Sequence, residues 1–177
     1  MGIADNFSIF KEIEFPSLLT LLNGISGMIC ILFAISKQYT FAAVFLLVAV
    51  FFDFIDGKLA RVMKKETPLG LELDSLCDVV SFGVAPVVLA YQTTMSTLGQ
   101  GAIFAGIIYM LYFCAGSLRL ARFNITKQHK YYEGMPITIN GTIVPILFFA
   151  GLTKWYPLWF LISAVLMISA FKLKKFI

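Results

Sequence analysis

Long apolar runs with few charges constrain this chain more than any other feature of its sequence. A helix needs about 20 mostly apolar residues to cross the hydrocarbon core of a bilayer. The 177-residue chain is 59% hydrophobic and 14% charged, whereas a soluble domain is about half apolar and a quarter charged. The sequence therefore predicts an integral membrane protein. We expect six spanning helices, at residues 18–36, 39–63, 72–96, 99–123, 137–153 and 156–172.

The arrangement of these stretches predicts one compact all-α bundle. The connections on one side are only a few residues long, so consecutive helices pack as antiparallel neighbours. Gly24 and Gly27 in the first span and Gly116 in the fourth offer small surfaces where helices can approach closely. We interpret residues 1–177 as a single membrane domain, in which residues 1–16 form an amphipathic helix at the membrane surface.

The basic residues predict the orientation of the bundle. With an even number of spans, both termini lie on one side of the membrane. Of the 14 lysines and arginines, all but Lys37 and Lys154 lie on that side. By the positive-inside rule the termini are cytoplasmic. We expect a multi-pass protein of the cell membrane, with its active site on the cytoplasmic side and no nucleic-acid partner.

Four aspartates lie in two of the predicted spans, where a charge costs on the order of 3 kcal/mol per residue. Asp53 and Asp56 are three residues apart and Asp74 and Asp78 are four apart, so each pair shares a helix face. The two helices are antiparallel, so the pairs can meet near the cytoplasmic interface. Four carboxylates with no His or Cys among them suit hard cations. We expect two divalent ions, Mg²⁺ or Mn²⁺, in a site that Ca²⁺ can also occupy.

The residues between the aspartates predict a phosphate site. Gly57 and Ala60 lie one turn apart beside the aspartate face and open a slot where a ligand can touch the helix backbone. Arg61 can face an anion, and the turn from Thr67 to Gly70 permits close approach through its glycine. Carboxylates that hold metal, an arginine and small residues together favour a diphosphate bridged by metal, as in phosphoryl-transfer enzymes.

The spacing D-x2-D-G-x2-A-R-x8-G-x3-D-x3-D, from Asp53 to Asp78, resembles the signature of the CDP-alcohol phosphotransferase family. The resemblance implies a six-helix membrane enzyme, usually dimeric, that displaces CMP from a CDP-linked lipid with an acceptor alcohol. It also implies that the first three motif aspartates chiefly hold metal and that Asp78 is the catalytic base. The expected CDP-lipid site comprises Asn23, Gly57, Ala60, Arg61, Thr67 and Gly70.

Three further stretches resemble one branch of this family, the phosphatidylserine synthases. They are SFGVAP at 81–86, RLARFN at 119–124 and EGMPITING at 133–141. The resemblance implies transfer from CDP-diacylglycerol, or from a CDP-archaeol type ether lipid, to L-serine in a membrane-embedded homodimer.

The expected serine site comprises Arg119, Arg122, Asn124 and Glu133. The two arginines are about 60° apart on their helix and can form a fork for the serine carboxylate, while Glu133 can meet the ammonium group. Each also has an ordinary interpretation, the arginines as topological anchors and Glu133 as a solvated loop residue. Asn23 and Asn140, both within apolar spans, either contact substrate or form hydrogen bonds between helices.

Two alternatives to serine transfer stay open at this point. The same chemistry with glycerol phosphate or inositol phosphate as acceptor would use the arginines to bind a phosphate. A cation transporter would also place carboxylates inside the membrane. The basic residues beside the cluster, and its position near one face of the membrane, favour an anionic ligand over transport.

Overall fold

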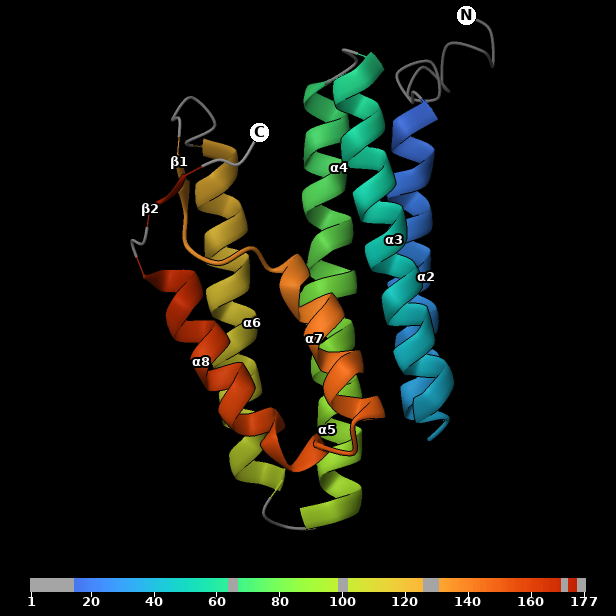
Figure 1. The fold of residues 1–177 in the computed structure, drawn as a ribbon, viewed down its shortest axis with the longest axis vertical. Helices are drawn as coiled ribbons and strands as arrows, with labels where there is room; N and C mark the ends of the chain where they lie inside the picture. The colour runs from blue at the N-terminus through green and yellow to red at the C-terminus, as the bar shows by residue number, and fades with distance from the viewer. Residues whose placement is uncertain (1–14, 64–66, 99–101, 126–130, 170–171, 175–177) are drawn as a thin grey trace, which may run out of the picture.

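The computed structural model describes residues 15–63, 67–98, 102–125, 131–169 and 172–174 and is shown in Figure 1. The predicted surface helix falls outside these ranges, except for the two residues that begin α2. The helices are α2 (Phe15–Ile35), α3 (Tyr39–Met63), α4 (Pro68–Asp78), the π-helix η2 (Val79–Val84), α5 (Ala85–Leu98), α6 (Ala102–Ile125), α7 (Thr138–Phe149), the 3₁₀ turn η4 (Thr153–Trp155) and α8 (Tyr156–Ile168). The strands are β1 (Tyr131–Glu133) and β2 (Lys172–Lys174).

The helices form an all-α bundle, as the sequence predicts. Among the described residues, four helical segments are long and apolar enough to cross a membrane: α2, α3, the continuous run Pro68–Thr97, and α6. Two shorter apolar segments, Thr138–Phe149 and Thr153–Ile168, complete the expected six. Large apolar side chains such as Phe54, Phe104 and Leu118 are exposed on the outside of the bundle, as expected of a surface that faces lipid.

The helix α7 is shorter than the span predicted at 137–153. Its 12 residues extend about 18 Å at about 1.5 Å per residue, against about 30 Å of hydrocarbon. Figure 1 shows that α7 begins part-way along the bundle. The non-helical segment before it is packed against protein, because Gly134 and Ile137 are buried and the Met135 N–H donates to the Leu166 carbonyl at 3.2 Å. Irregular backbone is tolerated at membrane depth when it is buried in this way.

Small residues let α2 approach the helix that follows α3. A Cβ atom on Gly27 would lie 2.6 Å from Cα of Ser81, and one on Gly24 would lie 2.9 Å from Sγ of Cys77. Such separations are too short for real Cβ contacts, so only glycine fits at Gly27 without a shift of its neighbours. The predicted packing role of these glycines is confirmed. As a result, α2 lies directly against the segment that carries Asp74 and Asp78.

The two short strands were not predicted from the sequence. β1 and β2 pair in antiparallel register, with Tyr131 opposite Lys174 and Glu133 opposite Lys172. They join the segment after α6 to the segment after α8, at the end of the bundle where α2 and α4 begin (Figure 1). Three-residue strands are too short for an alternating pattern to be recognised in a sequence.

Candidate active site

The four aspartates come together between α3 and α4. One carboxylate oxygen from each of Asp53, Asp56 and Asp74 lies within 4.8 Å of the other two. Asp78 lies next to this group, close enough for its carboxyl group to interact electrostatically with those of Asp53 and Asp74. Asp56 and Asp78 are almost fully buried, at 3% and 6% exposure. The prediction that the two pairs meet across antiparallel helices is therefore confirmed.

The donor set of this cluster fits a hard divalent cation. Oδ2 of Asp56 is buried and has no hydrogen-bond partner among the residues that the structure describes. A buried carboxylate oxygen needs a compensating partner, since leaving a charged group unsatisfied in an apolar interior is costly. Three carboxylates that converge on one point provide the oxygen ligands that Mg²⁺ and Mn²⁺ prefer. Asp53, Asp56 and Asp74 are thus suited to hold such an ion.

Asn23 contacts the cluster from α2. Its Nδ2 donates to Oδ1 of Asp78 at 3.3 Å, and its backbone carbonyl accepts from the Ser81 hydroxyl at 2.9 Å. Within the described part of the chain, Oδ1 of Asn23 is buried without a hydrogen-bond partner. The interhelical hydrogen bond that the sequence left as one alternative is present. Ser81 had not been singled out individually, because a serine in an apolar run gives no pattern of its own.

Gly57 and Ala60 were predicted to open a slot beside the aspartates, with Arg61 nearby to face an anion. A Cβ atom on Gly57 would have no atom of the described chain within 4 Å, so the space beside it is open. Nε of Arg61 donates to the Gly57 carbonyl at 2.8 Å, which holds the guanidinium group over this turn of α3. Ala60 is half-buried on the same stretch of the helix. Packing within the described residues therefore does not require a glycine at position 57.

Thr67 and Gly70 form the N-terminal cap of α4. Thr67 is the N-cap residue, and its Oγ1 accepts from the Gly70 N–H at 3.0 Å. Pro68 begins the helix, where its missing N–H is not needed. This cap fixes where α4 starts, and the start of α4 determines which of its faces carries Asp74 and Asp78.

The residues predicted to bind the acceptor lie near the end of α6 and in β1. Arg119 is half-buried, with its guanidinium carbon 5.5 Å from the centre of the Phe123 ring, and Arg122 is exposed. Asn124 is tied to α4, because its amide group exchanges hydrogen bonds with the Ser75 hydroxyl at 3.0 and 3.1 Å. Glu133 is in β1, and the structure describes its backbone but not its side chain.

The structure adds Ser75 and Glu72 to this region. Asn124 Nδ2 also lies 3.4 Å from Oε2 of Glu72, so two α4 residues face the end of α6. These contacts join residues about 50 positions apart in the chain, which is why spacing within one helix could not reveal them.

Asn140 is not part of this site. It is fully buried, and its Oδ1 accepts from Nε1 of Trp159 at 2.9 Å and from the Ser163 hydroxyl at 3.0 Å. Of the two interpretations left open by the sequence, the structure supports hydrogen bonding between α7 and α8.

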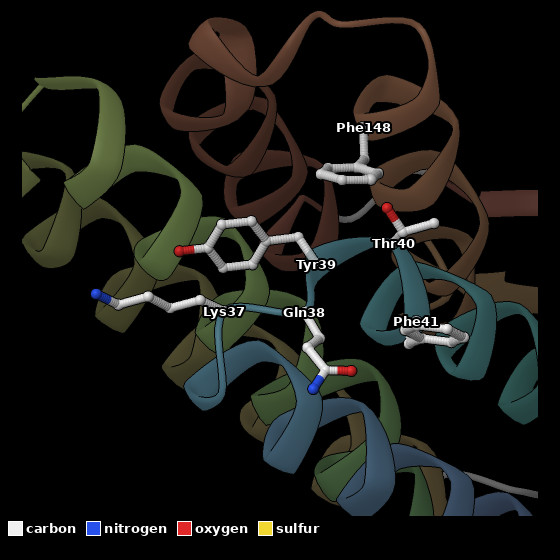
Figure 2. A pocket seen from close by; sticks show the side chains of 6 residues that line it. All are labelled: Lys37, Gln38, Tyr39, Thr40, Phe41 and Phe148. Carbon is white, nitrogen blue, oxygen red and sulfur yellow. The ribbon is translucent and has the colours of Figure 1, made fainter.

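A pocket of about 250 Å³ lies at the other end of α3. Tyr39 in its wall is 14 residues from Asp53, or about 21 Å along the helix, so the pocket is separate from the acidic cluster. In Figure 2 the side chains of Lys37 and Gln38 point in different directions and do not converge on one ligand. The lining residues are Lys37, Gln38, Tyr39, Thr40, Phe41 and Phe148.

The structure thus combines an apolar helical bundle with a cluster of carboxylates that could hold a metal ion and an arginine on the same helix as two of them. The chain matches the CDP-alcohol phosphatidyltransferase family over residues 13–172. It belongs to that family.

Several relatives are similar to this chain over most of its length. It is 34% identical over 156 residues to the CDP-diacylglycerol–serine O-phosphatidyltransferase of Saccharomyces cerevisiae, covering 78% of this chain and 55% of the relative. It is 38% identical over 136 residues to the Bacillus subtilis enzyme of the same name, covering 76% and 75%. It is 34% identical over 167 residues to the archaetidylserine synthase of Methanothermobacter thermautotrophicus, covering 92% and 70%. The chain spans little more than half the length of the yeast relative and 58% of a Mycobacterium leprae relative.

Proposed function

We propose that this chain transfers the phosphatidyl group of a CDP-linked lipid to the hydroxyl group of L-serine, releasing CMP. The convergence of Asp53, Asp56 and Asp74, with Asp78 bonded to Asn23, carries the proposal. It is supported by the family match and by relatives named as phosphatidylserine and archaetidylserine synthases. The donor is CDP-diacylglycerol, which the yeast and Bacillus subtilis relatives carry in their names, or an archaeol counterpart, as the archaetidylserine synthase suggests.

The CDP-lipid lies with its tails along the apolar helices and its diphosphate at the acidic cluster. Asp53, Asp56 and Asp74 hold the divalent ions, Mg²⁺ or Mn²⁺, of which we propose two. When bound, these ions neutralise the diphosphate and the charge that develops on the departing CMP. The open space at Gly57 admits the diphosphate to the backbone of α3, and Arg61, held by the Gly57 carbonyl, faces its charge.

Asp78 serves as the general base. It accepts the proton of the serine hydroxyl, the serine oxygen attacks the phosphorus that bears the lipid, and the bond from that phosphorus to CMP breaks. The hydrogen bond from Asn23 to Asp78 Oδ1 leaves the other carboxylate oxygen to take the proton. Arg119 and Arg122 bind the serine carboxylate, and Asn124 and Glu133 complete the polar surroundings of the acceptor.

The protein acts in the cell membrane as a homodimer of six-span subunits, with both termini and the acidic cluster at the cytoplasmic side. The exposed apolar exterior and the excess of basic residues toward one end support this placement. A monomer mass in mild detergent, together with full activity, would count against the dimer.

The test is CMP release by the purified protein from CDP-diacylglycerol with serine, glycerol phosphate or inositol phosphate. We expect release with serine, none in excess EDTA, and recovery on addition of Mn²⁺ or Mg²⁺. Asp53→Asn, Asp56→Asn and Asp74→Asn should each abolish release, because neutral amides are weaker ligands for hard cations. Turnover with a phosphorylated alcohol but not with serine would reassign the acceptor, and full turnover in EDTA would refute metal dependence.

A further inference from the structure

The helix that carries Asp74 and Asp78 contains a π-helical turn, and this turn starts immediately after Asp78. η2 spans Val79–Val84, and the Ala85 N–H donates to the Val80 carbonyl, five residues earlier. A widened turn accommodates an extra residue, which rotates everything beyond it by about 100° relative to an uninterrupted α-helix. α4 and α5 follow one continuous path in Figure 1. Because η2 lies between them, the face of α4 that carries the aspartates and the face of α5 that packs against other helices do not follow a single α-helical register.

One carbonyl in this turn lacks its ordinary helical donor. In an α-helix the Phe82 carbonyl would accept from the N–H four residues later, but that residue is Pro86, which has none. The hydroxyl group of Tyr112, from α6, donates to this carbonyl at 2.6 Å. Both Tyr112 and Phe82 are fully buried, so water cannot replace the tyrosine. A side chain from another helix thus completes the hydrogen bonding of the π turn.

Close packing connects η2 to the acidic cluster. A Cβ atom on Gly27 would lie 2.6 Å from Cα of Ser81, and one on Gly141 would lie 2.5 Å from the Phe82 ring. The turn is therefore held between α2 and α7 with no room to shift. Ser81 donates to the Asn23 carbonyl, and Asn23 donates to Asp78. A displacement of η2 reaches Asp78 both along the backbone and through this pair of hydrogen bonds.

We propose that Tyr112 is a positioning residue for the acidic cluster. Its hydrogen bond to the Phe82 carbonyl holds the π turn, which keeps Asp74 and Asp78 in register with Asp53 and Asp56. Tyr112 itself contacts neither substrate nor metal. The part of this inference that concerns turnover rests on the proposed function, whereas the part that concerns metal affinity does not.

The chain offers a matched control for this tyrosine. Tyr156 is also fully buried, packs edge-on against the same Phe160 ring, and donates its hydroxyl to the Val144 carbonyl at 3.0 Å. Tyr112→Phe and Tyr156→Phe each remove one buried hydroxyl-to-carbonyl bond. Only Tyr112→Phe removes it from the turn that follows Asp78.

The experiment compares these two variants with the unaltered full chain. Mn²⁺ binding is measured by electron paramagnetic resonance without substrate, thermal unfolding is followed in detergent, and CMP release gives kcat and KM. We expect similar losses of thermal stability in both variants. Only Tyr112→Phe should weaken Mn²⁺ binding and lower kcat, by about tenfold, at the low end of the effects seen when the surroundings of metal ligands are altered. KM for the CDP-lipid, measured at saturating Mn²⁺, should be unchanged.

Equal Mn²⁺ affinity in the two variants would overturn the inference. Ser81→Ala removes the hydrogen bond to Asn23 and should also weaken Mn²⁺ binding. Unaltered Mn²⁺ affinity in this variant would refute the proposed coupling from η2 through Asn23 to Asp78. This test remains available if Tyr112→Phe cannot be purified. If Mn²⁺ binding distinguishes the tyrosine variants but no alcohol releases CMP, the positioning role stands and the proposed function fails.

Discussion

Glycines in this bundle have two different roles, and the space beside each one distinguishes them. Gly27 and Gly141 face atoms of neighbouring helices at distances that no Cβ could tolerate, so packing requires glycine there. Gly134 adopts a φ of +80°, which side chains rarely adopt, and a Cβ would meet the Met167 carbonyl. Gly57 faces open space. Packing therefore does not require a glycine at this position, which the proposed function assigns to the CDP-lipid site.

Gly57→Ala should separate ligand binding from folding. Alanine favours a helix over glycine by about 1 kcal/mol, so the variant should be at least as stable as the parent. It should raise KM for the CDP-lipid, because the methyl group occupies the slot. Gly27→Ala is the control, since it should lower the thermal midpoint through its clash with Ser81. An unchanged KM in Gly57→Ala would remove this glycine from the substrate site.

In the proposed function, Arg119 and Arg122 of α6 select serine over other alcohols. Lysine keeps the positive charge at the membrane surface but loses the planar fork that binds a carboxylate through two bonds. We expect Arg119→Lys or Arg122→Lys to raise the serine requirement about tenfold, equivalent to about 1.4 kcal/mol, with CDP-lipid binding nearly unchanged. Steady-state kinetics with each substrate varied in turn measure this. Normal serine dependence in both variants would leave the arginines as topological anchors.

At the scale of single elements, helical spacing predicted that the aspartates cluster. Contacts between elements could not be predicted in this way. Asp53, Asp56, Asp74 and Asp78 follow from helix periodicity plus one antiparallel connection. The partners Ser75 and Tyr112 did not, because their contacts join α4 and η2 to α6. The π turn has only Pro86 as a signal in the sequence, and a proline alone does not distinguish a π turn from a kink.

The α7–α8 pair tests how much one buried amide contributes to the bundle. Asn140→Ala would leave the Trp159 N–H and the Ser163 hydroxyl without their common acceptor, at a cost of about 1–3 kcal/mol for a buried unsatisfied donor. We expect a lower thermal midpoint and unchanged KM for both substrates. Removing the donors as well, with Trp159→Phe and Ser163→Ala, should recover part of the loss. A stable variant with a raised KM would instead place Asn140 at the substrate.

At the scale of the whole molecule, the two ends of the bundle differ in their basic residues and in the elements that lie there. The turn after α2 and the turn before α8 carry Lys37 and Lys154, both exposed. The opposite end holds the end of α3 with Arg61, the end of α6 with Arg122, and the β1–β2 ribbon (Figure 1). The composition predicted a bundle of six apolar segments. Hydropathy could not predict that α7 is short, because the segment before α7 is non-helical although it is buried.

Cysteine labelling in intact cells can test the orientation of these faces. In a Cys114→Ser background, which removes the exposed native thiol, Lys37→Cys and Lys154→Cys should react with a membrane-impermeant maleimide added outside. Ile125→Cys, at an 85% exposed position at the end of α6, should react only after the cells are permeabilised. The excess of lysine and arginine near Ile125 is the physical reason, because basic segments are retained on the cytoplasmic side. The reverse pattern of labelling would place the acidic cluster at the outer surface and would contradict the proposed orientation.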